Sequence, residues 1–355
     1  MGQRISRRDF IKAAGAVGLG SMLFGCTMFS KAPTPSTALP ATTAPDAFTL
    51  IALPDTQFYS SSYPETFAAQ TQWIADNKDR LNIVYVAHLG DVVDAGYDST
   101  QWTHARRAMS RLDGLVPFGV APGNHDLYLN PAEDSPNSTF VQLFGPGCPW
   151  FNGKGWYGGA SSTGFSSWQK ISIGGQALIF LNLDDGAKAE ELAWGQTILD
   201  RHRGTPTIMV THSYLNAAGV RHAQAYLHDP GRLSAQQMWD GLVRRNSQIF
   251  MVLCGHTHGQ ARQIAWNDAG LPVHELLSDY QMLDNGGNGF LRIMTFYPAA
   301  NRIDVRTWSP TLQRDLRTSD TPGDGAFTLG VDFPARFRRW AGRETNRRLE
   351  VSRTS

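Results

Sequence analysis

Five apolar runs of this chain each lead into a short turn that carries oxygen or imidazole side chains. Short apolar runs bounded by turn residues are typical of buried strands. In open α/β sheets, ligand sites gather at the carboxyl ends of the strands. The pattern therefore predicts that distant side chains converge on one site. The five turns are Asp55-Thr56-Gln57, Gly90-Asp91-Val92-Val93-Asp94, Gly123-Asn124-His125-Asp126, Thr211-His212-Ser213 and Gly255-His256-Thr257-His258.

The sequence from residue 48 to residue 121 predicts strands and helices that alternate. The apolar runs predict strands at 48–53, 83–89 and 116–121. Helical spacing predicts one helix at 64–78, and Ser99 is a candidate cap for a second helix that runs to about residue 112. This β-α-β-α-β order indicates a largely parallel sheet.

The second half of the chain begins with a hairpin pattern and ends in strands without intervening helices. The hairpin turns at Gly174-Gly175, and Ser234 is a candidate helix cap. The four final strands indicate a second, antiparallel sheet. The further strands are expected at 168–173, 177–183, 207–210, 249–254, 261–266, 273–277, 291–296 and 303–308, and the further helices at 190–203 and 234–246.

An irregular segment, residues 127–164, interrupts the strand and helix pattern. It is rich in Gly, Pro and Asn and contains several aromatic residues. Long irregular insertions in compact domains are often functional, so this one could wall a cleft beside the third turn. The alternative is a surface segment whose aromatic side chains simply pack within it.

Composition and charge indicate a globular protein rather than a nucleic-acid-binding one. The chain has 355 residues, of which 41% are hydrophobic and 18% are charged, enough for one large core. The formal net charge is only +1, so no field of the whole chain attracts nucleic acid.

The N-terminal 26 residues have the pattern of an export signal. Ser6-Arg7-Arg8-Asp9-Phe10-Ile11-Lys12 is a twin-arginine pattern, and the apolar stretch 13–24 that follows is too short to span a bilayer as a helix. We therefore expect export in folded form by the twin-arginine machinery of a bacterium. Leu23-Phe24-Gly25-Cys26 resembles a lipobox, with Cys26 as the lipid-modified residue. The expected location is the periplasmic side of the envelope, anchored in a membrane; ordinary cleavage further along would leave a soluble periplasmic protein.

Two further segments flank the expected domain at 47–334. Residues 27–46 are rich in Pro, Thr and Ala, and their prolines forbid a continuous helix, which predicts an extended tether. The tail at 335–355 carries seven Arg against two Glu. It could meet anionic lipid, although a solvated tail is the simpler interpretation.

Two cysteines follow Cys26, and we expect both as free thiols. Cys254 ends an apolar strand, where a thiol is buried and inert. A disulfide with Cys148 is the alternative in an oxidising compartment.

The five turns in this order resemble the calcineurin-like metallophosphoesterase superfamily, over about residues 48–308. The resemblance implies an α/β fold, namely a four-layer α-β-β-α sandwich of two mixed sheets flanked by helices. It also implies a metal-dependent hydrolase of phosphoric monoesters or diesters that uses a metal-bridging hydroxide. A non-catalytic metal-binding lipoprotein with the same fold is the alternative.

The resemblance implies a role for each turn. Asp91 would bridge two divalent cations, and His125 would donate a proton to the leaving oxygen, with Asp126 holding its imidazole ring. Asp94 stays outside the metal set, since it either orients a ligand or bonds the loop backbone. The other implied ligands are Asp55, Gln57 and His258 for the first cation, and Asn124, His212 and His256 for the second.

Gln57 departs from the common family pattern, in which a histidine follows the aspartate at this spacing. Oxygen and imidazole ligands without thiolate suit Mn, Fe or Zn. A neutral amide oxygen at Gln57 favours Mn; the alternatives are a weak first site or a degenerate enzyme. Among the remaining histidines, His88 is expected in the core, whereas His222 and His228 lie in a loop that could reach the cleft.

Overall fold

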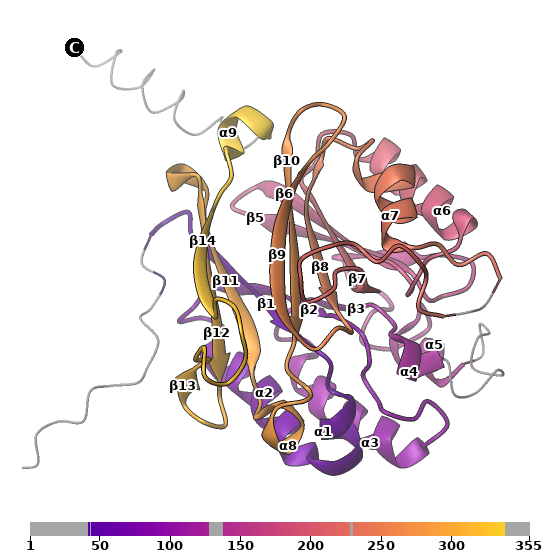
Figure 1. Ribbon diagram of the computed structural model, residues 1–355, viewed down its shortest axis with the longest axis vertical. Coiled ribbons are helices and arrows are strands. Elements are labelled where there is room, and N and C mark those ends of the chain that lie inside the picture. Colours follow the sequence, from indigo (N-terminus) through magenta and orange to yellow (C-terminus); the bar gives the residue numbers. More distant parts are fainter. Residues whose placement is uncertain (1–41, 43, 128–137, 228–229, 338–355) are drawn as a thin grey trace, which may run out of the picture. The chain divides into compact units, whose positions relative to one another are not determined.

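The computed structural model describes residue 42 and residues 44–127, 138–227 and 230–337. Two seven-stranded β-sheets pack face to face, and helices cover the outer face of each (Figure 1). The fold is therefore the expected four-layer α-β-β-α sandwich of two mixed sheets. In Figure 1, α6 and α7 lie on the far side of the second sheet from β11 and β12.

The first sheet has the strand order β13-β12-β11-β1-β2-β3, with β14 paired to β12. Strands β1, β2 and β3 run parallel, as the β-α-β-α-β pattern predicted, while β11 runs antiparallel to β1. The strands are β1 (Phe48–Leu53), β2 (Ile83–His88), β3 (Phe118–Val120), β11 (Leu291–Tyr297), β12 (Arg302–Ser309), β13 (Arg314–Asp315) and β14 (Ala326–Gly330).

The second sheet has the strand order β4-β5-β6-β7-β8-β10-β9. Strands β6, β7, β8 and β10 run parallel, and β5 and β6 form the expected hairpin. The strands are β4 (Tyr157–Ala160), β5 (Ser167–Ile173), β6 (Gln176–Asn182), β7 (Thr207–Ser213), β8 (Ile249–Gly255), β9 (Gly259–Trp266) and β10 (Pro272–Asp279).

The prediction that the last four strands form a separate antiparallel sheet is wrong. Strands β9 and β10 extend the second sheet from β8, whereas β11 and β12 extend the first sheet from β1. Each added pair covers a strand edge that would otherwise leave backbone groups unpaired. The alternation of side chains is the same in either arrangement, so the sequence pattern could not assign the partners.

Helices cover both sheets, and several of them connect successive strands. The expected Ser234 cap forms a capping box with Gln237, but α7 then gives way to a short π-helical turn at Trp239–Val243. Asp98, rather than Ser99, caps α3. The α-helices are α1 (Gln57–Ser62), α2 (Pro64–Asn77), α3 (Ser99–Met109), α4 (Asn124–Leu127), α5 (Thr139–Phe144), α6 (Ala189–Arg201), α7 (Ala235–Met238), α8 (Asp284–Gly287) and α9 (Phe333–Arg336).

Three apolar layers hold the sandwich together. One lies between the first sheet and α2 and α3, one between the two sheets, and one between the second sheet and α6 and α7. The described part of the irregular insertion joins the first layer, where Phe151 stacks on Tyr157 with ring centroids 5.1 Å apart. Packing, rather than a cleft wall, is therefore the role of these aromatic rings.

The two cysteines after Cys26 have the state that the sequence predicts. Cys148 and Cys254 are buried free thiols, as expected, and burial raises the pKa of both. Several predicted features lie outside the described residues, namely the twin-arginine pattern, Cys26, most of the tether, His228 and the tail beyond residue 337. Within the described ranges, no helix combines the length and apolar character needed to cross a bilayer.

Candidate metal centre

The five expected turns follow the carboxyl ends of five strands. Asp55 lies just beyond β1, Asp91 beyond β2 and Asn124 at the start of α4 after β3. His212 is the second-to-last residue of β7, and His256 directly follows β8. Both sheets thus contribute side chains to the same edge of the sandwich.

Four of the predicted side chains meet around Nε2 of His212. This nitrogen lies 3.2 Å from Oδ2 of Asp91, 3.1 Å from Oδ1 of Asn124 and 3.2 Å from Nδ1 of His256. Atoms from Asp91, His212 and His256 all lie within 4.8 Å of one another. Such a set of carboxylate, amide and imidazole atoms suits a divalent cation.

Backbone contacts fix the orientation of His212. Its Nδ1 donates to the carbonyl oxygen of Leu89 over 2.9 Å, and a carbonyl can only accept, so the proton is on Nδ1. Nε2 is therefore the atom available to a cation. Gly90 allows the His212 ring to pack against the backbone, because a Cβ at Gly90 would lie 2.4 Å from Nδ1 of His212. The φ of Gly90 is +103°, which also favours glycine.

Asp91 is held in an uncommon backbone conformation at the centre of the cluster. Its φ is +48°, in the left-handed region, and that of His256 is +71°. Such strain in residues other than glycine concentrates at functional sites. Oδ1 of Asp91 accepts from the backbone N–H of His125 over 2.9 Å. A Cβ at Gly123 would lie only 2.2 Å from this oxygen, so glycine is required there.

The titratable groups of the cluster shift one another's pKa in opposite directions. Burial would lower the pKa of His212, but Asp91 and Asp55 raise it well above its usual value. Burial, together with the neighbouring His212, lowers the pKa of His256 to about 3, so its imidazole is neutral. A divalent cation would compete with protons for the same lone pairs, so metal binding at this cluster depends on pH.

The predicted first metal site is less completely assembled than the second. Asp55 is buried, and its carboxylate accepts from the backbone N–H of His256, with Oδ2 3.1 Å away. Gln57 is 2% exposed, and its Oε1 has no hydrogen-bond partner among the described residues. A buried acceptor without a donor is costly, and a cation would satisfy it. His258 is exposed, and no described hydrogen bond joins it to Asp55 or Gln57.

Asp126 does not hold the imidazole ring of His125, contrary to our expectation. Its Oδ1 accepts from the backbone N–H groups of Val92 and Val93, and its Oδ2 accepts from that of Gly123. Burial, followed by repulsion from the Asp91 carboxylate, raises the pKa of Asp126 to about 7. Asp126 therefore ties together the loops that carry Asp91 and Asn124.

Asp94 contacts His125 instead. Nδ1 of His125 donates to the carbonyl oxygen of Asp94 over 2.7 Å, and the Asp94 carboxylate lies 3.4 Å from the same nitrogen. Nδ1 carries the proton, and Nε2 of His125 has no hydrogen-bond partner among the described residues. The His125 side chain is 31% exposed, so this nitrogen can meet a bound molecule.

Two acidic residues near the cluster were missed from the sequence. Asp185 follows β6, accepts from the backbone N–H of Ser213 over 3.0 Å and leaves Oδ2 buried without a described partner. Asp279 ends β10, where burial raises its pKa to about 7. Burial, followed by repulsion from the Asp279 carboxylate, also raises the pKa of Asp55. Both lie at carboxyl ends of strands, so the rule that located the five turns could have found them.

The loop that follows β7 reaches the cluster, which is one of the possibilities that the sequence left open for His222. Nε2 of His222 lies 3.1 Å from Oγ1 of Thr257, and the Tyr226 ring lies 4.1 Å from the His256 ring between centroids. His88 is a core residue, as expected, and bonds Oγ1 of Thr56 over 3.0 Å.

The two mixed sheets and the cluster at their strand ends define a metallophosphoesterase fold. A family model for calcineurin-like phosphoesterases matches residues 48–260, and the chain belongs to this family. The uncharacterized protein YvnB of Bacillus subtilis is 34% identical over 305 residues, which are 83% of this chain but only 22% of that protein.

A solved structure shows the same fold at low sequence identity, and a second one has a lower structural similarity. A dimetal phosphatase from Danio rerio matches with a TM-score of 0.50 and 11% identity, covering 80% of this chain and 99% of that one. A purple acid phosphatase from yellow lupin seeds matches with a TM-score of 0.47 and 11% identity, covering 84% of this chain and 56% of that one.

Proposed function

We propose that this protein hydrolyses phosphoric esters, monoesters or diesters, with two divalent cations held at the edge of the sandwich. The observation that carries the proposal is the convergence of Asp91, Asn124 and His256 on Nε2 of His212, each within 3.2 Å. Membership of the calcineurin-like phosphoesterase family supports the same reaction class.

Each cation has its own set of candidate ligands. Asn124, His212 and His256 would hold one cation, Asp55, Gln57 and His258 would hold the other, and Asp91 would serve both. The unpartnered Oε1 of Gln57 supports its part in this set. Two such cations polarise a phosphoryl group and provide a hydroxide nucleophile at neutral pH. The neutral oxygen of Gln57 favours Mn over Zn at its site.

His125 is the proposed proton donor to the leaving oxygen. Its protonated Nδ1 is engaged by the Asp94 carbonyl, so the second ring nitrogen, Nε2, is the one that would carry and release the proton. The backbone N–H of His125 donates to Asp91, which ties the position of the proton donor to that of the bridging carboxylate. Asp126 supports both by bonding the two loops that carry them.

The test is hydrolysis of alkyl phosphate mono- and diesters by protein loaded with a defined metal. Wild type is compared with Asp91→Asn, His125→Ala and the control Asp240→Asn, whose carboxylate is a surface partner of Arg244. We expect turnover by wild type and the control, with large losses in the other two variants. Equal background rates in all four proteins would favour the non-catalytic metal-binding alternative, and the monoester-to-diester ratio narrows the substrate class.

We also propose that the protein works outside the cytoplasm, anchored through Cys26. The twin-arginine pattern and the lipobox-like Leu23-Phe24-Gly25-Cys26 support this location. Membrane fractionation of the wild type and of Cys26→Ser tests it. Release of the variant into the soluble periplasmic fraction is expected, and identical fractionation of the two proteins would contradict the anchor.

A further inference from the structure

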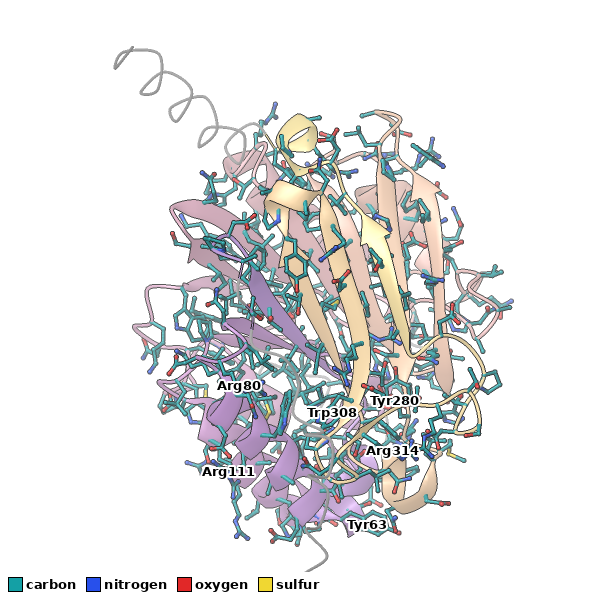
Figure 2. All side chains as sticks on the ribbon, turned by 90° about the vertical axis from the view of Figure 1, so that its left-hand side faces the viewer. Tyr63, Arg80, Arg111, Tyr280, Trp308 and Arg314 are labelled. Carbon is teal, nitrogen blue, oxygen red and sulfur yellow. The ribbon has the colours of Figure 1, made fainter. Side chains whose placement is uncertain are left out.

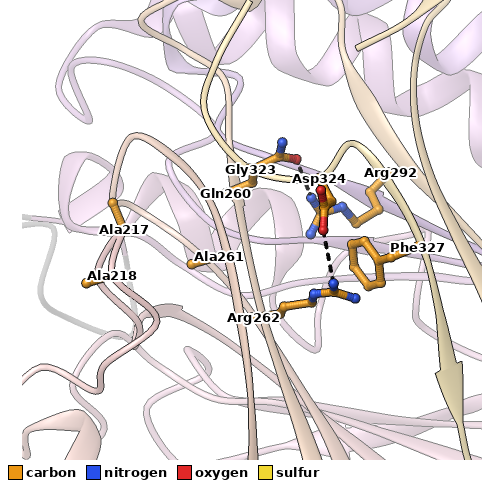
Figure 3. Close-up of a pocket in the computed structure, with 9 residues that line it drawn as sticks. All are labelled: Ala217, Ala218, Gln260, Ala261, Arg262, Arg292, Gly323, Asp324 and Phe327. Carbon is orange, nitrogen blue, oxygen red and sulfur yellow. Dashed lines mark hydrogen bonds and ion pairs between the residues drawn. The ribbon is translucent and has the colours of Figure 1, made fainter. Parts of the chain in front are cut away.

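A cavity of about 230 Å³ opens beside β9, between this strand, the segment after β7 and the loop before β14 (Figure 3). Polar lining comes from Gln260, Arg262, Arg292 and Asp324. Strand β9 begins directly after His258, so the Cα atom of Gln260 lies at most about 7 Å from that of His258. Gln260 pairs with Ser278, next to Asp279 at the end of β10, so the cavity lies at the same end of these strands as the proposed metal centre.

The inner wall of the cavity holds a buried arginine without an acidic partner. Arg292 is 1% exposed, and its Nη atoms donate to the carbonyl of Leu277, Oε1 of Gln260 and the hydroxyl of Tyr280. Tyr280 is labelled at the lower end of the strands in Figure 2. All three acceptors are neutral, Arg292 forms no ion pair with a described carboxylate, and its Nε is buried without a partner. A buried charge without a counter-charge is costly, and an anion would offset that cost.

A second arginine stands at the mouth of the same cavity. Nη2 of Arg262 lies 3.0 Å from Oδ2 of Asp324. The guanidinium carbons of Arg262 and Arg292 lie 4.2 Å and 5.6 Å from the centroid of the Phe327 ring, which orients both groups. Figure 3 shows the two guanidinium groups beside this ring. Two positive charges against the single carboxylate of Asp324 leave the cavity with a net charge of about +1.

We propose that this cavity is a subsite for a second anionic group of the substrate, a carboxylate or a phosphate remote from the ester that is cleaved. Guanidinium groups recognise such planar or tetrahedral oxyanions through paired N–H donors. The cavity is smaller than the roughly 300 Å³ of a site for a whole small ligand, so it suits one end of a molecule. This inference rests on the proposed function, because it names the class of substrate for that reaction.

Two diesters of equal length test the subsite in the metal-loaded enzyme. Butyl 4-nitrophenyl phosphate and 3-carboxypropyl 4-nitrophenyl phosphate differ only in a terminal methyl or carboxylate. We expect wild type to prefer the carboxylate by about tenfold in kcat/KM, the effect of one charge-assisted hydrogen bond. The preference should be lost in Arg262→Gln and should increase in Asp324→Asn, since that variant removes the competing carboxylate.

The side chains of Arg262 and Asp324 are exposed, so both variants should fold like the wild type. Arg292 joins the two sheets and is therefore not substituted. The matched control is Arg244→Gln, which removes an exposed arginine that pairs with Asp240 and Asp268. Its preference should equal that of wild type. Equal kcat/KM for the two diesters in wild type, or a preference that survives in Arg262→Gln, would overturn the subsite.

Calorimetric titration with methylphosphonate separates this proposal from the proposed function, because it needs no turnover. Binding should weaken about tenfold in Arg262→Gln, strengthen in Asp324→Asn and stay unchanged in Arg244→Gln. If wild type cleaves neither diester but shows this binding order, the hydrolase proposal fails and the cavity is a site for a free anion. If both diesters are cleaved and binding is equal in all four proteins, the hydrolase proposal holds and the subsite is wrong.

Discussion

Nδ1 of His125 donates to the backbone carbonyl of Asp94 over 2.7 Å, a contact that leaves Nε2 of the same ring directed away from the protein backbone. A carbonyl acceptor fixes the tautomer without depending on the charge of any side chain. The Asp94 carboxylate, 3.4 Å from Nδ1, adds a weaker electrostatic contact. The position of the proposed proton donor is thus set mainly by the backbone of the loop that also carries Asp91.

Substitution of His125 should slow hydrolysis in a way that depends on the leaving group. For an alkyl phosphate ester, His125→Ala should lower kcat by about 10²–10⁴-fold, since the alkoxide needs a proton as it leaves. For a 4-nitrophenyl ester the loss should be much smaller, because 4-nitrophenolate is stable without one. Steady-state kinetics on both esters test this, with His104→Ala as a control on helix α3. Equal losses for the two esters would show that His125 does not act as the acid.

Substitution of Asp126 should weaken folding and metal binding rather than proton transfer. Asp126→Asn leaves one oxygen where two now accept from three backbone N–H groups. We expect a loss of about 1–3 kcal/mol in the free energy of unfolding, the cost of leaving buried donors unpaired. Urea unfolding measures this, with the exposed Asp200→Asn as control. The ratio of alkyl to 4-nitrophenyl rates should stay as in wild type, and a changed ratio would instead place Asp126 in the proton transfer.

The strands and the ligand-bearing turns could be predicted because both depend on local sequence. Apolar runs such as 249–254 must be buried, and polar residues that follow them fall at the strand ends. The partners of β10 and β11 could not be predicted, since pairing is decided by contacts between distant segments. The directions of the Asp94 and Asp126 side chains could not be predicted from the sequence either. They depend on contacts between loops, such as that of Asp126 with the backbone of Val92 and Val93, which a local pattern does not specify.

Gln57 should control which metal the first site prefers. Gln57→His replaces a neutral oxygen by an imidazole, so the fraction of Zn retained from an equimolar Mn and Zn mixture should rise by about tenfold. Elemental analysis of the dialysed protein measures the ratio, with Gln72→His on the exposed face of α2 as control. Wild type should also be more active with Mn than with Zn. Tightly retained Zn in both sites of wild type, without stimulation by Mn, would contradict this assignment.

His274, near the amino-terminal end of β10, should make the fold sensitive to acid. Its Nε2 donates to the carbonyl of Gly330 over 3.0 Å, and its Nδ1 is buried without a described partner. Burial, helped by Arg336 and opposed by the bond to Gly330, lowers the pKa of His274 below its usual 6.5.

As the pH falls below about 6.5, the unfolded chain therefore binds a proton at this position that the folded protein resists. Stability is lost in that direction, by at most about 1.4 kcal/mol per pH unit for one group. His274→Gln keeps an N–H donor for Gly330 and cannot titrate, so its free energy of unfolding should fall less between pH 7.5 and pH 5.5 than that of wild type. Urea unfolding at the two pH values tests the difference, and parallel losses in both proteins would show that His274 does not couple protonation to unfolding.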